Sequence, residues 1–268
     1  MAAYQLGFIG TGNMGSALAR AACKTISPAR IALANRTPEK AAALAEELGC
    51  AAVDNKTAAS SSEFLFLGVK PQMMAQMLEG IRPALDARHD RFVLVSMAAG
   101  LPIARIREMA GPYPVIRIMP NTPVSVGAGT TLYSCSDDVT MQERASFLSA
   151  MSAAGAFDEL PEALIDAGSA ISGCGPAYVC LFLEALADGG VACGLPRKKA
   201  LAYATQTLRG TAELLLQSGE HPGVLKDAVC SPAGSTIAGV HALEAHAFRA
   251  AAAEAVEAAF LRTKELGK

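Results

Sequence analysis

The sequence Gly10-Thr11-Gly12-Asn13-Met14-Gly15 directly follows a short apolar run, Tyr4-Gln5-Leu6-Gly7-Phe8-Ile9, and precedes an Ala-rich stretch from Ser16 to Cys23. This order predicts a strand, a tight turn and a helix. In such a turn the first glycine permits the bend, the second lets the backbone approach a pyrophosphate, and the third lets the helix pack on the strand. The free N–H groups at the helix start then face the anion. The segment therefore predicts a dinucleotide-binding βαβ unit.

The end of the next predicted strand, Arg30 to Ala34, indicates which dinucleotide is bound. Sites selective for NAD usually have an Asp or Glu there, and a carboxylate would repel a 2′-phosphate. This chain has Asn35-Arg36-Thr37 instead. Arg36 can form a bidentate contact with phosphate and can stack on adenine. We therefore expect NADPH, with NADH possible but less preferred; an ordinary βαβ turn with a surface arginine is the alternative.

Short apolar strands alternate with helices along the first 161 residues, as in a doubly wound parallel sheet. The predicted segments are a helix over Pro38 to Leu48, capped by Thr37 and ended by Gly49, and strands over Phe64 to Val69, Phe92 to Ser96 and Val115 to Met119. Strand signals stop after Pro161, and Ala-rich helical segments follow. We predict an α/β fold: a Rossmann-type NADP-binding domain over residues 1–161 and an all-helical substrate-binding and dimerisation domain over 162–268.

One helical segment of the second half, Pro176 to Cys193, is apolar on nearly every face, with Glu184 and Asp188 as its only charges. A helix that is apolar all round must be buried, yet a helical domain of about 100 residues has little interior. We therefore expect a second subunit to cover it.

Two Gly-rich segments of this half precede helices, Ser172-Gly173-Cys174-Gly175-Pro176 and Ser231-Pro232-Ala233-Gly234-Ser235-Thr236. Backbone N–H groups at such helix starts can bind an anion, and a small carboxylate would fit. Two capped helix starts in a packed bundle would give the same pattern.

Composition and charge argue against several classes of protein. A net charge of −2 without basic runs offers no surface for nucleic acid or an anionic membrane. The first residues lack a basic segment followed by an uninterrupted apolar stretch, and no run reaches about 18 apolar residues, so we expect neither export nor membrane insertion. Seven cysteines without CxxC spacing predict reduced thiols, and four scattered histidines predict no metal site. We therefore expect a cytoplasmic protein without nucleic-acid, membrane or metal partners.

Taken together, the motifs resemble those of the pyrroline-5-carboxylate reductase family, the last enzymes of proline biosynthesis. The matching segments occur in family order over essentially the whole chain, and the last three are more specific than the glycine turn. They are Phe8-Ile9-Gly10-x-Gly12-Asn13-Met14, Val69-Lys70-Pro71, Ser96-Met97-Ala98-Ala99-Gly100, Arg117-x-Met119-Pro120-Asn121-Thr122-Pro123, Ser172-Gly173-x-Gly175-Pro176-Ala177-Tyr178 and Ser231-Pro232-x-Gly234-x-Thr236.

The resemblance implies NADPH-dependent reduction of the cyclic imine 1-pyrroline-5-carboxylate to L-proline by a homodimer, which the family commonly assembles further into rings. It implies that the substrate carboxylate is held by backbone amides of Gly234, Ser235 and Thr236 with Ser231 close by, and that the Thr236 hydroxyl donates a proton to the ring nitrogen. Glu162 is expected at the substrate. The residues expected to contact the cofactor are Ile9, Gly10, Thr11, Gly12, Asn13, Met14, Asn35, Arg36, Thr37, Asn55, Val69, Lys70, Pro71, Met97, Ala98 and Ala99. The chain departs from the family pattern at Cys174, Ala228 and Ala233.

Other functions remain open at this point. The β-hydroxyacid dehydrogenases join a similar glycine turn to an interlocking helical domain, but they use a catalytic lysine on the helix after the second Gly-rich segment. The stretch from Pro176 to Leu195 contains no Lys or Arg. A reductase of another cyclic imino acid would share the carboxylate site and differ in its pocket walls. A non-catalytic NADPH-binding regulator would bind the cofactor without turning over an imine.

Overall fold

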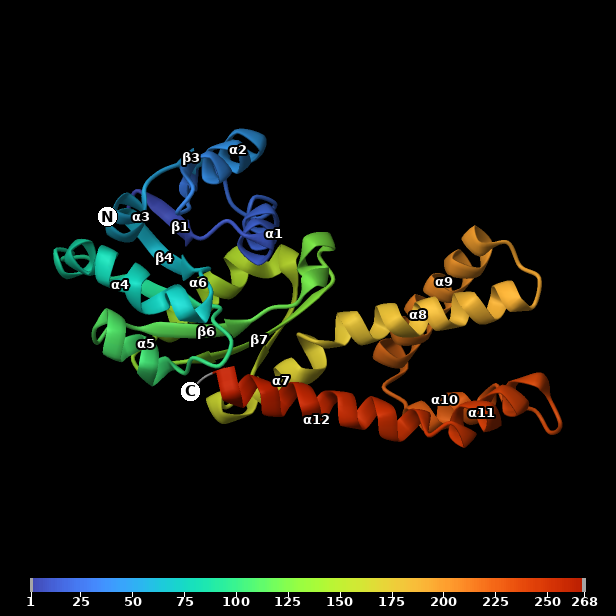
Figure 1. Cartoon of the computed structure of the whole chain (residues 1–268). Coiled ribbons are helices and arrows are strands. Elements are labelled where there is room, and N and C mark those ends of the chain that lie inside the picture. Colours follow the sequence, from blue (N-terminus) through green and yellow to red (C-terminus); the bar gives the residue numbers. More distant parts are fainter. Residues whose placement is uncertain (1, 267–268) are drawn as a thin grey trace. The chain divides into compact units, whose positions relative to one another are not determined.

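The structure is a computed structural model that describes residues 2–266 (Figure 1). Contacts divide it into two compact units, which we describe separately. The first runs to Cys174 and includes the end of the last helix from Ala259, and the second is Gly175–Ala258. The domain boundary expected after residue 161 stays a prediction. The helix that follows it packs on the sheet of the first unit through Ile165, which is fully buried against Met119 and Leu132.

The first unit is built on one eight-stranded sheet of order β3-β2-β1-β4-β5-β6-β7-β8. Its strands are β1 (Tyr4–Ile9), β2 (Ile31–Ala34), β3 (Ala51–Ala52), β4 (Ser62–Leu67), β5 (Val93–Ser96), β6 (Val115–Met119), β7 (Gly129–Cys135) and β8 (Gly155–Glu159). Its helices are α1 (Asn13–Ala22), α2 (Pro38–Leu48), α3 (Asn55–Ser61), α4 (Pro71–Asp86), α5 (Ile103–Ala110), α6 (Met141–Met151) and α7 (Glu162–Ser172). The strand order reverses between β1 and β4, where doubly wound sheets bind their ligands.

Alternate residues of the central strands face two separate layers of helices. Phe64 and Phe66 of β4 pack with α1, α2 and α6, whereas Leu65 and Leu67 pack with α3, α4 and α5. All four side chains are fully buried, and Figure 1 shows helices on both faces of the sheet. Because each strand is apolar on both faces, it fits the middle layer of a three-layer α/β fold, and the predicted doubly wound sheet is confirmed.

Two strands run opposite to the other six, because β7 pairs antiparallel with β6 and β8 pairs parallel with β7. The link between them contains one short 3₁₀ helix, η2 (Thr122–Val126). Parallel neighbours need a crossover of a dozen or more residues, usually a helix, and this link is too short to provide one. The sheet is therefore mostly parallel rather than parallel throughout.

The second unit contains helices α8 (Gly175–Ala192), α9 (Arg197–Ser218), α10 (Pro222–Ala228), α11 (Ser235–Ala245) and most of α12 (Phe248–Leu266). It has no strand among its residues 175–258, all of which the structure describes. In α8 the single buried residue is Ala187, so the apolar surface expected there is uncovered in one chain. The run Glu162–Ala192 also has the length and hydropathy of a membrane-crossing helix, a test that judges length and composition alone.

Candidate functional site

The glycine turn between β1 and α1 has the shape that its sequence predicts. Gly10 has φ +108°, and a Cβ there would lie 2.5 Å from the carbonyl oxygen of Gly68. A Cβ on Gly15 would lie 2.1 Å from the carbonyl oxygen of Gly10. Packing therefore requires both of these glycines. A Cβ on Gly12 would meet no atom within 4 Å, so this glycine keeps the space in front of α1 open to a ligand.

Helix α1 begins without a side-chain cap. Its N-cap residue is Gly12, so the N–H groups of Asn13, Met14 and Gly15 have no partner within the helix. The helix dipole adds partial positive charge at this end. The Thr11 hydroxyl beside the turn is buried and has no hydrogen-bond partner among the described residues. Unpaired donors beside an open space fit a pyrophosphate.

Asn35 joins the two loops at which NADPH is expected. The Thr11 N–H donates to Asn35 Oδ1 at 3.3 Å, and Asn35 Nδ2 donates to the carbonyl oxygen of Thr37 at 3.1 Å. Thr37 occupies the N-cap position of α2, as predicted, but its side chain makes no capping hydrogen bond. Because Asn35 is neutral, it fixes both loops without placing a negative charge where a 2′-phosphate would bind.

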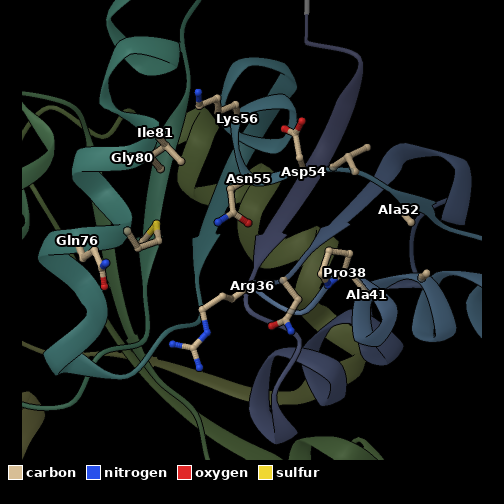
Figure 2. A pocket seen from close by; sticks show the side chains of 14 residues that line it. Arg36, Pro38, Ala41, Ala52, Asp54, Asn55, Lys56, Gln76, Gly80 and Ile81 are labelled. Atoms are coloured by element: carbon tan, nitrogen blue, oxygen red, sulfur yellow. The ribbon is translucent and has the colours of Figure 1, made fainter.

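A cavity of about 730 Å³ lies beside the β2–α2 loop (Figure 2). Asn35, Arg36 and Asn55 line it, so the structure brings three predicted residues together. In Figure 2 the Arg36 side chain extends towards the part of α4 that carries Gln76. The sequence reasoning missed the contributions of Lys56, Gln76, Met77 and Gly80. Gly80 was the available signal, because glycine is unfavourable inside a helix and a Cβ here would meet open space.

The other predicted cofactor residues follow the carboxyl ends of three neighbouring strands. Ile9 ends β1, and Val69, Lys70 and Pro71 follow β4, with Lys70 exposed at the N-cap of α4. Met97, Ala98 and Ala99 follow β5. Since β1, β4 and β5 are adjacent and parallel, these segments lie at one edge of the sheet. An extended dinucleotide can therefore lie across them.

Glu162 begins α7, and protein groups already engage its carboxylate. Its Oε1 atom accepts a hydrogen bond from the Ile103 N–H at 2.6 Å and lies 3.5 Å from Arg117 Nη1. Arg117 is buried in β6 and also pairs with Asp166 of α7 at 2.5 Å. The predicted contact of Glu162 with the substrate stays a prediction.

The predicted carboxylate site forms the start of α11 in the second unit. Gly234 is the N-cap and provides no side-chain cap, so the N–H groups of Ser235 and Thr236 have no partner within the helix. The Gly234 N–H instead donates to the carbonyl oxygen of Ser231 at 3.0 Å, closing a turn. Ser231, Ser235 and Thr236 are exposed in the single chain. The loop therefore presents two free amides and three hydroxyl groups.

Ala233 occupies an unfavourable backbone position in this loop. Its φ is +58°, in the left-handed region that favours glycine. An L-residue other than glycine pays about 1–2 kcal/mol there. The chain departs from the family pattern at this position, so the substitution keeps the turn at some cost in stability.

Comparison with known proteins matches both halves of the chain. A family model described as pyrroline-5-carboxylate reductase dimerisation covers residues 162–266, and one described as NADP oxidoreductase coenzyme F420-dependent covers residues 5–100.

Full-length relatives carry the same description. The chain is 44% identical over 267 residues to a pyrroline-5-carboxylate reductase of Synechocystis sp., covering 98% of each protein, and 37% identical over 268 residues to that of Escherichia coli. It is similar to a solved Plasmodium falciparum pyrroline carboxylate reductase with NADP bound, with a TM-score of 0.89, 32% identity and 100% of each chain covered. A Coxiella burnetii pyrroline-5-carboxylate reductase also matches, with a TM-score of 0.89, 30% identity and 99% of each chain covered. From its glycine turn to its last helix, this chain belongs to the pyrroline-5-carboxylate reductase family.

Proposed function

We propose that this chain reduces the cyclic imine 1-pyrroline-5-carboxylate to L-proline with NADPH, the reaction of its family. The observation that carries the proposal is the uncapped start of α11, where the Ser235 and Thr236 amides can receive a small carboxylate. The same chain has a phosphate-binding turn and lacks an acid after β2. A nucleotide site and a carboxylate site in one chain suit reduction of a small imino acid.

The first unit would hold NADPH, which supplies a hydride from C4 of its nicotinamide ring. Asn13, Met14 and Gly15 would donate backbone N–H groups to the pyrophosphate, and Arg36 would contact the 2′-phosphate. The loops that begin at Val69 and Met97 would border the nicotinamide half. The open space at Gly12 and the unpaired N–H groups of α1 support this placement.

The second unit would bind and orient the imino acid. The Ser235 and Thr236 amides and the α11 dipole favour a carboxylate, and the hydroxyls of Ser231 and Ser235 can donate to its oxygens. Gly234 contributes by shaping the loop, because its own N–H is used in the turn. Holding the carboxylate fixes the position of the imine carbon, and hydride transfer needs that carbon about 3–3.5 Å from the donor.

Thr236 is the residue that we propose handles the proton. Its hydroxyl would donate a hydrogen bond to the lone pair of the neutral imine nitrogen and relay to it one proton, which water returns to the hydroxyl, while hydride adds to the imine carbon. Because the imine nitrogen is itself basic and becomes a ready hydride acceptor once protonated, a neutral hydroxyl is sufficient for this relay. Replacing Thr236 with Ala is expected to lower kcat by about 100-fold, within the range of general acid catalysis, and to leave NADPH affinity unchanged. An equal loss of both would contradict the role.

The rate of NADPH oxidation on adding 1-pyrroline-5-carboxylate tests the function directly. NADH and a six-membered cyclic imino acid run in parallel separate the alternatives. Faster turnover of the five-membered ring with NADPH supports the proposal. Faster turnover of the six-membered ring indicates a reductase of another imino acid, and NADPH binding without turnover of either indicates a regulator.

We also propose that the chain acts as a homodimer, which further assembles into a ring of dimers, in the cytoplasm. Large apolar side chains of the second unit, such as Leu181 and Leu216, are exposed in one chain, at 69% and 85%. A second copy of the matched dimerisation segment would cover them. The seven cysteines are free thiols, as a reducing compartment would keep them. Light scattering after size-exclusion chromatography measures the assembly.

A further inference from the structure

We propose that Glu162 is a positioning residue, which Arg117 holds in place and which fixes the β5–α5 loop, residues 97–102, against the nicotinamide ring. The inference rests on the proposed function in one respect, since that function places this loop at the cofactor. Under this inference Glu162 acts through protein groups, the Ile103 N–H and Arg117, rather than by contacting the substrate.

The loop is held at both ends through Arg117. At its start, Ser96, the last residue of β5, pairs with Arg117 in the register of the sheet. At its end, the N–H of Ile103, the first residue of α5, donates to Glu162 Oε1 at 2.6 Å. The Arg117 side chain connects these two contacts, because its Nη1 atom lies 3.5 Å from the same Glu162 oxygen. One arginine therefore ties together the two ends of the loop.

The first turn of α5 depends on this contact. Its N-cap residue is Pro102, which supplies no side-chain hydrogen bond. Glu162, from a distant part of the sequence, provides a charged acceptor for one of the free N–H groups. A carboxylate that accepts an N–H at a helix start makes one of the stronger hydrogen bonds in proteins. The position of the loop end is thus set by α7.

Burial makes the arrangement specific. The Arg117 side chain is 3% exposed, and its two partners on α7 are Glu162 and Asp166. Removing one of these carboxylates leaves the buried Arg117 cation with a single negative partner, which strongly destabilises the folded protein. The fully buried Ile165 anchors α7 to the sheet between these two acids. Because Ile165 packs on the sheet, α7 can support the end of the loop.

Apolar packing holds Ala98 and Ala99 of the β5–α5 loop, and a cavity borders the rest of it. Ala98 is buried, and Ala99 contacts the cluster that contains Ile165. A cavity of about 400 Å³ borders the loop at Gly100 and Pro102, and Glu162 and Lys264 of α12 also line it. Because side chains do not fill this cavity, packing there does not hold the loop, and the hydrogen bond from Ile103 to Glu162 restrains its end.

The experiment compares Glu162→Ala and Glu162→Gln with the wild-type protein. Glutamine keeps an oxygen that can accept from Ile103, whereas alanine removes it. Glu159→Gln is the matched control, because Glu159 also pairs with an arginine, Arg144, but at the surface. Four quantities are measured: amide exchange at Ile103 without cofactor, affinity for NADPH, affinity for adenosine 2′,5′-bisphosphate, and the KM for the imine.

In Glu162→Ala we expect exchange at Ile103 to become at least about tenfold faster, as the loss of one hydrogen bond to a charged group implies. NADPH affinity should fall about tenfold, while adenosine 2′,5′-bisphosphate, which lacks the nicotinamide half, should bind within about twofold of wild type. Glu162→Gln should recover part of the NADPH affinity, because its amide oxygen can still accept from Ile103 but no longer compensates the charge of Arg117. Glu159→Gln should change nothing.

Other outcomes overturn the inference. A higher KM for the imine with unchanged Ile103 exchange and unchanged NADPH affinity would place Glu162 at the substrate. Equal weakening of both nucleotides together with lower thermal stability would mean a purely structural role. The wild-type protein could fail to reduce the imine while Glu162→Ala still weakens binding of NADPH but not of adenosine 2′,5′-bisphosphate. The proposed function would then be wrong, and the positioning role of Glu162 would stand.

Discussion

The two units of this chain bury their apolar residues in opposite ways. The first unit encloses large side chains such as Phe8, Phe64 and Phe66 within its own layers. In the second unit, residues 175–258, the buried apolar side chains are three alanines, Ala187, Ala200 and Ala204. Burial of apolar area is the main favourable term in folding, so the first unit can be stable alone, whereas the second needs a cover from outside itself.

The same contrast applies to the site. The predicted nucleotide-binding residues lie on loops at the edge of the sheet of the first unit, and packing fixes the backbone of the glycine turn. The proposed carboxylate loop lies on a unit whose apolar surface is exposed in one chain. Nucleotide binding should therefore tolerate changes in assembly, and imine turnover should depend on assembly. The predictions below test this difference.

The largest effect is expected from Phe66→Ala in the first unit. Phe66 is fully buried and stacks on Phe8 with ring centroids 4.3 Å apart. Truncating a buried phenylalanine costs about 3–5 kcal/mol. Chemical denaturation followed by circular dichroism should show that loss at any protein concentration. Val126→Ala, at a side chain that is 76% exposed, is the control and should be near neutral.

The next effect concerns the second unit and depends on concentration. Leu181→Glu changes a side chain on α8 that is 69% exposed in one chain. If a second copy covers it, a buried unpaired charge should weaken association by at least about 100-fold, or roughly 3 kcal/mol. Sedimentation equilibrium measures the shift, while NADPH binding should persist. Met141→Glu, on α6 of the first unit and 82% exposed, should leave assembly intact. An unchanged dimer in Leu181→Glu would place the interface elsewhere.

Cofactor choice is expected to respond to Arg36→Glu with a smaller change. The variant replaces the guanidinium that we propose binds the 2′-phosphate with a repelling carboxylate, so NADPH should bind about 30- to 100-fold more weakly, equivalent to roughly 2–3 kcal/mol. NADH lacks the 2′-phosphate and should be little affected. Fluorescence titration of both cofactors measures the ratio. Arg30→Glu makes the same charge change outside the cavity, and an effect equal to that of Arg36→Glu would exclude a specific contact.

A pH-dependent effect of about 1 kcal/mol is expected at Glu143, in the capping box of α6. Burial acts to raise the pKa of this carboxyl group, but hydrogen bonds from Arg91 and Thr140 outweigh it and leave the pKa below its ordinary value. The stabilisation is therefore fully present above the ordinary pKa and is lost as pH falls through the lowered folded value. Urea midpoints of Glu143→Gln and wild type should differ at pH 7, and the difference should shrink as the pH falls below the ordinary pKa of a glutamate and through the lowered folded value. Glu46→Gln is the control, and a constant difference for Glu143→Gln would exclude the ionised carboxylate as the cause.

The smallest expected effect is a gain from Ala233→Gly. Glycine removes the left-handed strain at φ +58° but raises the entropy of the unfolded chain, leaving a net gain of about 0.5 kcal/mol. Thermal unfolding measures it. Ala228→Gly, at the end of α10, should instead lose stability, because glycine is unfavourable in a helix. A loss in both variants would mean that Ala233 makes favourable contacts that outweigh its strain.

Many secondary-structure elements of this protein depend only on residues close in sequence and could be predicted from it. The strand from Tyr4 to Ile9, the turn that needs Gly10 and Gly15, and the helix from Pro38 to Leu48 follow from neighbouring residues. The αL cap at Gly49 does so as well. Apolar period and glycine placement determine these features within a few residues of chain, so no distant contact is needed to predict them.

Tertiary structure alone decided the rest. It placed β7 antiparallel to β6, and it made the Gly234 N–H donate to the carbonyl oxygen of Ser231. It brought Gln76 and Gly80 of α4 to the cavity beside Arg36, and it paired Glu162 with Arg117, 45 residues earlier in the chain. The sequence by itself determined which elements form and which chemistry they carry, because propensity and periodicity act over short distances. Which side chains meet is decided only when the sheet and helices pack, because a contact depends on the positions of both partners in space.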